Sequence, residues 1–95
     1  SGFESYLAET PENPQVLIYL GISYMELDKY NEALAAFEKL EAGNSLDSAK
    51  ANWYKALVYL KGNDTKSASE ILNKITYSET NFKYNEATRL LSQLD

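Results

Sequence analysis

A pattern of small and apolar residues recurs in this chain at an interval of about 35 residues. Three pairs of residues are separated by 35 positions: Tyr24 and Tyr59, Ala33 and Ala68, and Phe37 and Leu72. In the other direction, Phe3 lies 34 positions before Phe37. A period of about 34 residues is typical of helix–turn–helix repeats, which stack because one helix pair cannot bury its own apolar face. The chain is therefore expected to fold as a stack of helix pairs.

Apolar residues at helical spacing predict where the helices lie. The expected helices cover residues 3–9, 14–27, 30–42, 46–61, 64–76 and 83–94, with a polar link over 77–82. We expect Asp28 to cap the helix over 30–42, because an aspartate oxygen can accept a hydrogen bond from a free N–H of the first turn. Gly43 and Asn44 are expected to end that helix, since both residues accept a positive φ. The turn over residues 62–64 supplies the cap of the helix that follows it.

Small residues in the middle of helices indicate where two helices approach closely. Gly21 and Ala56 occupy equivalent places, and a glycine there costs about 1 kcal/mol relative to alanine. We expect the partner helix of each pair to compensate by approaching at this point, with Ala33 and Ala68 facing the small residues. Phe37 is expected to be buried between the two helices of its own repeat and the start of the next.

Composition excludes several classes of function. The chain has nine basic and fourteen acidic residues and a formal net charge of −5, with no cluster of lysines, which disfavours nucleic acids and anionic membranes as partners. It contains no Cys and no His, so it lacks the usual thiolate nucleophile, zinc ligands and physiological-pH base. No apolar run reaches the length of a membrane span. We therefore expect no enzymatic activity, no metal and no cofactor.

The remaining polar motifs favour ordinary solvated surfaces. Two pairs of carboxylates are spaced by three residues: Glu38 with Glu41, and Glu9 with Glu12. Neither pair is accompanied in sequence by a nucleophile, a base or a metal ligand. An EF-hand is excluded around Asp28 because its glycine and its ligand spacing are missing. Asn63 begins an N-glycosylation sequon in an exposed turn, but a three-residue motif occurs often by chance.

The repeat resembles a known family. The segment Leu20-Gly21-x-x-Tyr24, followed by Tyr30-x-x-Ala33-x-x-x-Phe37, is similar to the tetratricopeptide signature. Leu17 and Leu40 replace the Trp and Ala that are usual there. The second repeat matches more loosely, through Ala56, Tyr59, Ala68, Leu72 and Ile75. Trp53 stands one place later than the family's Trp, and Asn52 and Lys55 occupy positions that usually carry apolar residues. This resemblance implies an all-α, right-handed α-solenoid.

The resemblance also implies a division of the single domain, residues 1–95. Residues 14–47 correspond to repeat one and residues 48–82 to repeat two. Residues 1–13, with Pro11 near their end, resemble the end of a preceding repeat. Residues 83–95 are interpreted as a terminal capping helix. The spacing of small and large residues in this last segment repeats that of the earlier helices: Ala33-Phe37-Leu40, Ala68-Leu72-Ile75 and Ala87-Leu91-Leu94.

Family members hold peptides in a concave groove lined by the first helix of each repeat. Carried over to this chain, the groove residues are Gln15, Ile18, Tyr19, Ile22, Met25, Glu26, Lys50, Trp53, Tyr54, Leu57, Leu60 and Lys61. Apart from Lys50, the Lys and Asn residues with which chaperone-binding members clamp a terminal carboxylate are missing. The groove is expected to be apolar and aromatic. Its central strip is formed by Ile18, Ile22, Trp53 and Leu57, with Trp53 as the main contact.

Two functions remain open on this evidence. The chain can be a scaffold or adaptor module that binds a protein segment in the groove. Alternatively, it is a structural or self-associating end fragment of a larger solenoid, of the kind found in bacterial envelope proteins, with no separate ligand. The first function implies a protein or peptide partner, and the second allows a homo-oligomer. The absence of Cys fits both a cytoplasmic and a bacterial periplasmic location.

Overall fold

The structure, a computed structural model, describes residues 13–43 and 46–94, and all regular elements in these ranges are helical. Within these ranges five α-helices follow one another: α2 (Pro14–Glu26), α3 (Tyr30–Ala42), α4 (Ala51–Lys61), α5 (Thr65–Ile75) and α6 (Tyr84–Leu94). A short 3₁₀ helix, η1 (Leu46–Lys50), precedes α4. The expected helix over 3–9 lies outside the described residues. The all-α prediction is confirmed.

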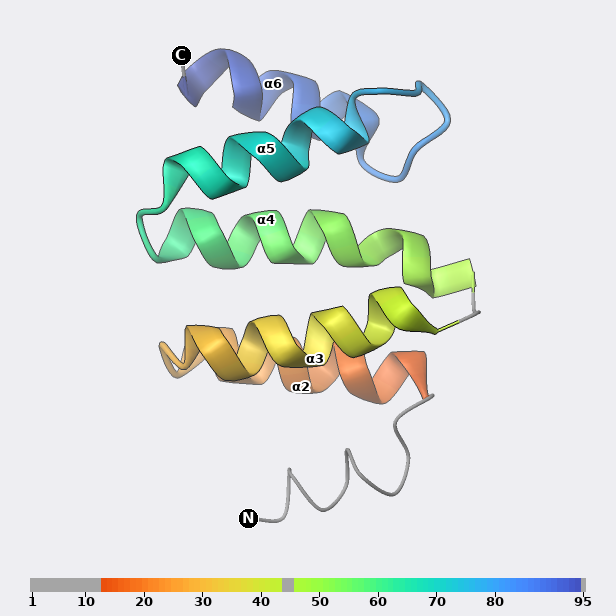
Figure 1. Ribbon diagram of the computed structural model, residues 1–95, viewed down its shortest axis with the longest axis vertical. Coiled ribbons are helices and arrows are strands. Elements are labelled where there is room, and N and C mark those ends of the chain that lie inside the picture. Colours follow the sequence, from red (N-terminus) through yellow and green to blue (C-terminus); the bar gives the residue numbers. More distant parts are fainter. Residues whose placement is uncertain (1–12, 44–45, 95) are drawn as a thin grey trace.

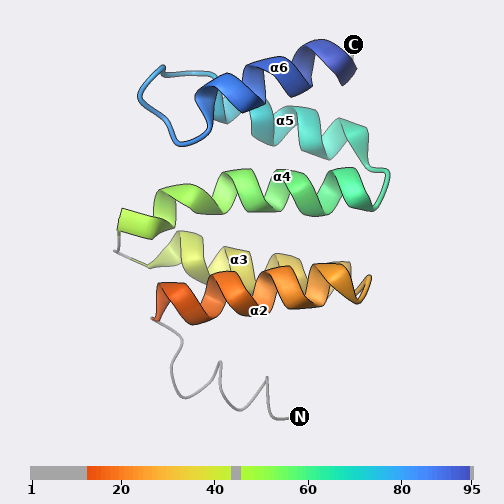
Figure 2. The same ribbon diagram turned by 180° about the vertical axis from the view of Figure 1, so that it is seen from behind.

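The helices form a stack in which successive helices alternate between two sides (Figure 1). Helices α3 and α5 lie on the nearer side in this view, whereas α2, α4 and α6 lie on the nearer side from behind (Figure 2). The stack is elongated, with principal extents of 40 × 27 × 14 Å. This arrangement confirms the predicted α-solenoid, because each helix packs mainly on its neighbours along the chain.

Two helices begin with side-chain caps. Asn13 Oδ1 accepts a hydrogen bond of 3.2 Å from the Val16 N–H, and Pro14 occupies the first position of α2, where no N–H is needed. Asp64 Oδ1 accepts a hydrogen bond of 3.1 Å from the Ser67 N–H at the start of α5. The predicted cap after the turn over 62–64 is therefore confirmed.

The predicted cap of α3 is wrong. The cap position is Lys29, which makes no side-chain hydrogen bond to the helix, and Asp28 stands one residue too early. Asp28 instead takes a left-handed conformation with φ of 61°, and Asn63, 35 residues later, does the same with φ of 65°. Aspartate and asparagine tolerate this conformation better than most residues. The sequence signal at Asp28 therefore marks the turn and not the cap.

Helix α3 ends at Ala42 as expected, but Gly43 does not take the expected positive φ. Gly43 has φ of −74° and ψ of 170°, so the helix ends in extended backbone and not in a left-handed residue. Asn44 lies outside the described residues. The Ser48 hydroxyl donates a hydrogen bond of 2.8 Å to the Gly43 carbonyl, which holds the chain as it turns toward α4. The helix expected over 46–61 is divided into η1 and α4.

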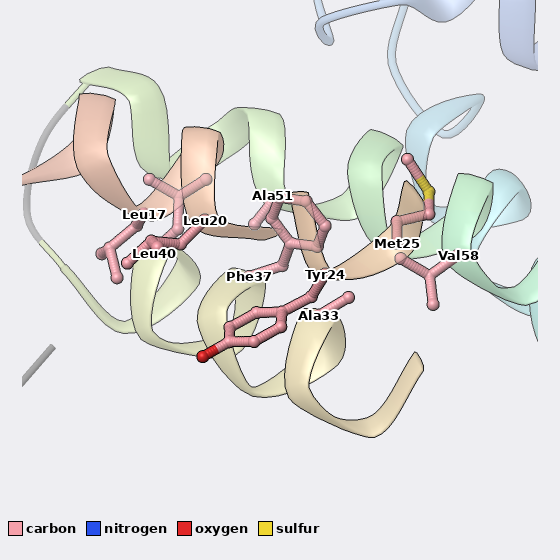
Figure 3. Packing of buried hydrophobic residues seen from close by; sticks show 9 residues of the cluster. All are labelled: Leu17, Leu20, Tyr24, Met25, Ala33, Phe37, Leu40, Ala51 and Val58. Atoms are coloured by element: carbon pink, nitrogen blue, oxygen red, sulfur yellow. The ribbon is translucent and has the colours of Figure 1, made fainter. Parts of the chain in front are cut away.

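The first core cluster joins α2, α3 and α4 around Phe37 (Figure 3). Its buried members are Leu17, Leu20, Tyr24, Met25, Ala33, Phe37, Leu40, Ala51 and Val58. Phe37 is 0% exposed, and its ring stacks on that of Tyr54 with centroids 5.2 Å apart. This confirms the predicted burial of Phe37 between its own repeat and the next. At Gly21 the nearest side-chain atoms belong to the Phe37 ring and not to Ala33, and a methyl group there would overlap that ring.

The second core cluster joins α4, α5 and α6. Its buried members are Ala56, Ile71, Leu72, Ile75 and Ala87. Three leucines of α6 pack against it, namely Leu90, Leu91 and Leu94. The exposed residues of the same helix are polar: Asn85, Thr88, Arg89, Ser92 and Gln93. Helix α6 therefore covers the apolar residues of α5 with one face and presents a polar face to solvent.

Candidate protein-binding surface

The twelve predicted groove residues lie on α2, on α4 and at the end of η1, but they differ in exposure. Met25 is 8% exposed and belongs to the first core cluster, so it contributes little to any surface. The exposed members are Gln15, Tyr19, Glu26 and Lys61. The half-buried members are Ile18, Ile22, Lys50, Trp53, Tyr54, Leu57 and Leu60. Figure 2 shows α2 and α4 on the same side of the stack.

The four residues of the apolar strip are all half-buried, and they rest on two different clusters. Ile18, Ile22 and Leu57 pack against the first cluster. Trp53 packs against the second. Each side chain is therefore held by the core on one side while part of it stays accessible. The strip is supported from beneath and is not an open row of fully exposed side chains.

The two tyrosines that flank the strip have different surroundings. Tyr54 is half-buried because its ring stacks on Phe37, with an angle of 13° between the ring planes. Tyr19, its counterpart 35 residues earlier, is 68% exposed. Sequence reasoning treated these residues as equivalent groove residues. The stack shows that this position can also serve the contact between successive repeats.

Two lysines and two aromatic rings, one of them Trp53, are connected by cation–π contacts. Lys83 Nζ lies 5.8 Å from the centroid of the Trp53 ring and 5.6 Å from that of Phe82. Lys50 Nζ also lies near the Phe82 ring, 5.4 Å from its centroid. Ammonium groups at such distances are attracted by the ring quadrupole. Sequence reasoning missed Phe82 and Lys83, because Phe82 ends the polar link and Lys83 directly precedes α6, where no repeat position predicts their neighbours.

Polar contacts tie the start of α2 to η1, which leads into α4. Gln15 Nε2 donates a hydrogen bond of 3.4 Å to Asp47 Oδ2. Lys50 Nζ lies 2.8 Å from the other carboxylate oxygen of Asp47. The hydrogen bond from Lys50 to this carboxylate, together with its negative charge, raises the pKa of Lys50. The end of the surface at η1 thus carries an ion pair between Lys50 and Asp47.

A second polar group joins the C-terminal ends of α2 and α4. Lys61 Nζ lies 3.9 Å from Asp28 Oδ1, and the Tyr30 hydroxyl lies 3.1 Å from the same oxygen and 3.4 Å from the Lys61 carbonyl oxygen. Desolvation raises the pKa of Tyr30, and the hydrogen bond to Asp28 and the charge of that carboxylate raise it further. The apolar strip therefore lies between two polar groups.

The carboxylate pairs form no catalytic arrangement within the described residues. Glu38 is exposed, and Glu41 Oε1 forms an ion pair of 2.8 Å with Lys55 Nζ across α3 and α4. Glu9 and Glu12 lie outside the described residues. No group of three potential metal ligands occurs in residues 13–43 and 46–94. In the same ranges, every helix is too short or too polar to traverse a lipid bilayer.

The comparison with protein families agrees with the repeat geometry. A family model described as tetratricopeptide repeat matches residues 18–78, which is well over half of the 95 residues. No curated protein and no solved structure matches the chain. Tetratricopeptide repeats generally mediate protein–protein interactions and are typically not enzymes. The signature residues Gly21, Ala33 and Phe37 all lie in the matched segment and in the first core contact, and the chain belongs to the tetratricopeptide repeat family.

Proposed function

We propose that this chain binds a segment of a partner protein along the surface of α2 and α4. The observation that carries the proposal is the apolar strip itself. Ile18 and Trp53 are counterparts in successive repeats, as are Ile22 and Leu57, and all four are held half-buried on the core. A row of apolar side chains at matching repeat positions offers a partner a continuous contact.

The same proposal assigns residues 14–47 and 48–82 to two repeats, 1–13 to the end of a preceding one, and 83–95 to a terminal cap.

The strip is suited to binding because its side chains are already ordered. Burying apolar surface contributes about 25 cal/mol per Å². Residues packed on the core also lose little further conformational freedom when a partner arrives. The polar groups at the two ends, around Asp47 and around Asp28, would favour a partner with polar residues on both sides of an apolar segment. An amphipathic helix with anchors at helical spacing is one such partner.

Trp53 is proposed as the main contact. Tryptophan is enriched among the residues that contribute most to interface energies. Here the Lys83 ammonium lies 5.8 Å from its ring centroid, which restricts the ring and adds a cation beside it. Because Trp53 also packs on the second cluster, its removal affects both binding and stability. The two effects therefore have to be measured on the same variant.

The experiment uses peptides selected from a displayed random library on the immobilised chain. We expect Trp53→Ala to weaken their binding at least 10-fold in calorimetry, while Tyr77→Ala leaves it unchanged. Tyr77 is 91% exposed in the link between α5 and α6 and is a matched aromatic control. Denaturant unfolding of both variants separates binding from stability. If Trp53→Ala binds the peptides normally but loses several kcal/mol of stability, Trp53 is a core residue and the proposal fails.

The alternative proposal, self-association without a separate ligand, has one observation in its favour. Tyr19 and Leu27, both from the region of α2, are 68% and 61% exposed. Light scattering over a range of concentrations separates the two functions. A molecular mass that rises with concentration supports self-association, and a constant monomer mass supports binding to another protein.

A further inference from the structure

The link between α5 and α6 follows a defined path. It lies at the same end of the stack as η1 in both views (Figures 1 and 2). Asn81 fastens it to the end of α5, because its side-chain amide donates hydrogen bonds of 2.9 Å to the Ile75 carbonyl and 3.4 Å to the Lys74 carbonyl. The two residues that follow, Phe82 and Lys83, therefore start from a fixed point beside the start of α4.

Lys83 is an unusual residue for its position. Its φ is 64°, and the other described non-glycine residues with positive φ are Asp28 and Asn63, types that tolerate this conformation better than lysine does. Lys83 also directly precedes α6, where its carbonyl accepts a hydrogen bond of 2.8 Å from the Ala87 N–H. A positive charge at a helix start is unfavourable because of the helix dipole. The reason for a lysine here therefore lies in the contacts of its side chain.

The Lys83 ammonium has three neighbours. Its Nζ lies 5.8 Å from the Trp53 ring centroid, 5.6 Å from that of Phe82 and 3.6 Å from Glu86 Oε2. Aromatic rings attract an ammonium group through their quadrupoles, and the carboxylate adds an opposite charge. The Lys83 side chain is 37% exposed, so its ion pair with Glu86 contributes little stability. The structure thus shows that an ammonium fits beside the two rings and that the present one is only weakly held.

The second lysine beside Phe82 is held differently. Lys50 Nζ lies 5.4 Å from the Phe82 centroid and only 2.8 Å from Asp47 Oδ1. The Asp47 carboxylate balances its charge at this short distance, whereas the corresponding distance between Lys83 and Glu86 is 3.6 Å. Lys83 is therefore the ammonium that leaves more easily, and Lys50 stays with its carboxylate.

We propose that Trp53 and Phe82, together with Glu86, form a binding site for the ammonium group of a lysine side chain from a partner segment. Lys83 occupies this site while no partner is bound. A partner's lysine makes the same contacts as Lys83, because it carries the same charge and the same donors. Contacts along the apolar strip then favour the partner in this exchange. The formal net charge of −5 also favours a partner with basic residues.

The inference rests on the proposed function, because it names the chemistry of the partner residue that lies beside Trp53. It adds a role for Lys83, which competes with the partner for the same two rings. Loss of the Lys83 side chain should therefore strengthen the binding of an ammonium group, whereas loss of an ordinary contact residue weakens binding.

The first test is an NMR titration of the full chain with Nα-acetyl-lysine N-methylamide. Trp53 is the only tryptophan of the chain, so its indole N–H gives one assigned signal. We expect the lysine derivative to shift this signal and to move the ε-methylene signals of Lys83 toward those of a free lysine. The matched probe without a charge is Nα-acetyl-norleucine N-methylamide. Equal shifts with both probes, or no shift with the lysine derivative, would overturn the proposal.

The second test compares variants with the same lysine probe. Lys83→Ala should lower its dissociation constant by about 2- to 5-fold, the factor that corresponds to one exposed cation–π contact. Lys83→Gln, which keeps most of the chain length without the charge, should change it in the same direction. Lys39→Ala removes the same charge from an exposed position on α3 and should leave the constant unchanged. An unchanged constant in both Lys83 variants, or an equal change in the Lys39 variant, would contradict competition by Lys83.

The two proposals can fail separately, because the lysine probe contains no peptide segment. If selected peptides bind through Trp53 but the lysine probe does not bind, the ammonium site is wrong and the proposed function stands. If the lysine probe binds and Lys83 competes with it, but no selected peptide depends on Trp53, the proposed function is wrong and the ammonium site stands.

Discussion

The two repeats fill the same place in their cores with different pairs of side chains. Repeat one combines Gly21 with Phe37, and repeat two combines Ala56 with Leu72, at positions 35 residues apart. All four residues are buried. In repeat one, the small Gly21 is needed beside the large Phe37, because a methyl group on Gly21 would occupy the space of the Phe37 ring. The repeat thus preserves a combined volume more closely than it preserves individual side chains.

Repeat one also uses its large residue for a second contact. The Phe37 ring meets Gly21 on one side and stacks on Tyr54 of the next repeat. Leu72 lies in a cluster whose other members come from α4, α5 and α6, and no aromatic stack involves it. The contact between the two repeats therefore depends on Phe37 more than the second core cluster depends on Leu72. Two predictions test this comparison.

The largest effect is expected at Phe37. Phe37→Ala should cost about 3–5 kcal/mol of unfolding free energy, because it leaves a cavity and exposes the partner surface of Tyr54. Leu72→Ala should cost about 2–5 kcal/mol by the cavity alone. Since neighbouring repeats stabilise one another, the Phe37 variant should lose structure in both repeats. Urea unfolding followed by circular dichroism measures this, and a melting temperature close to that of the unmodified chain would contradict the placement of Phe37.

A smaller effect is expected from exchanging the paired residues. Overpacking by Gly21→Ala alone should lower the unfolding free energy by about 1–3 kcal/mol. The better helix propensity of alanine should offset about 1 kcal/mol of this loss. The double variant Gly21→Ala with Phe37→Leu recreates the pair of side chains found in repeat two. Its loss of unfolding free energy should be smaller than the sum of the losses in the two single variants. The unfolding free energies of the two single variants and the double variant form the cycle. Strict additivity would show that Gly21 and Phe37 are not matched in volume.

The sequence predicts the parts of the fold that repeat. The 35-residue period and the apolar spacing locate α2 to α6, and the signature at Phe37 predicts its burial between two repeats. The details at turns are less accessible, because several residue types fit the same local pattern. Asp28 can cap a helix or adopt a left-handed φ, and only the packed structure decides between them.

The sequence is less informative about the candidate surface. Periodicity places Met25 on the same helix as Ile18 but does not reveal that Met25 turns into the core. Lys83, which lies over both the Trp53 ring and the Phe82 ring, comes with Phe82 from the segment between α5 and α6. Their proximity depends on how the link after α5 returns to α6, and no local signal encodes that path. Contacts between non-repeating segments are therefore the part that requires the structure.

The repeats also differ in how their second helices begin. The cap residue before α3 is Lys29, which makes no side-chain hydrogen bond to the helix, whereas the cap residue before its counterpart α5 is Asp64, which accepts hydrogen bonds from Ser67. These hydrogen bonds, from the side chain and from the backbone of Ser67, lower the pKa of Asp64, and the charge of Lys66 adds to the effect. Only repeat two therefore has a helix start whose stability depends on the ionisation of its cap.

The smallest predicted effect follows from this difference and has a definite sign. Because folding lowers the pKa of Asp64, its contribution is fully present above the pKa of an unfolded aspartate, about 3.9, and is lost as the pH falls through the folded value. Asp64→Asn keeps a good cap without a titrating group. We expect the Asn variant to have the same unfolding free energy as the unmodified chain near pH 7. As the pH falls below about 4, the Asn variant should lose less of this free energy than the unmodified chain. Asp64→Ala should be less stable already near pH 7. Unfolding in urea across this pH range measures all three proteins. Parallel curves for the Asn variant and the unmodified chain would show that protonation of Asp64 does not weaken α5.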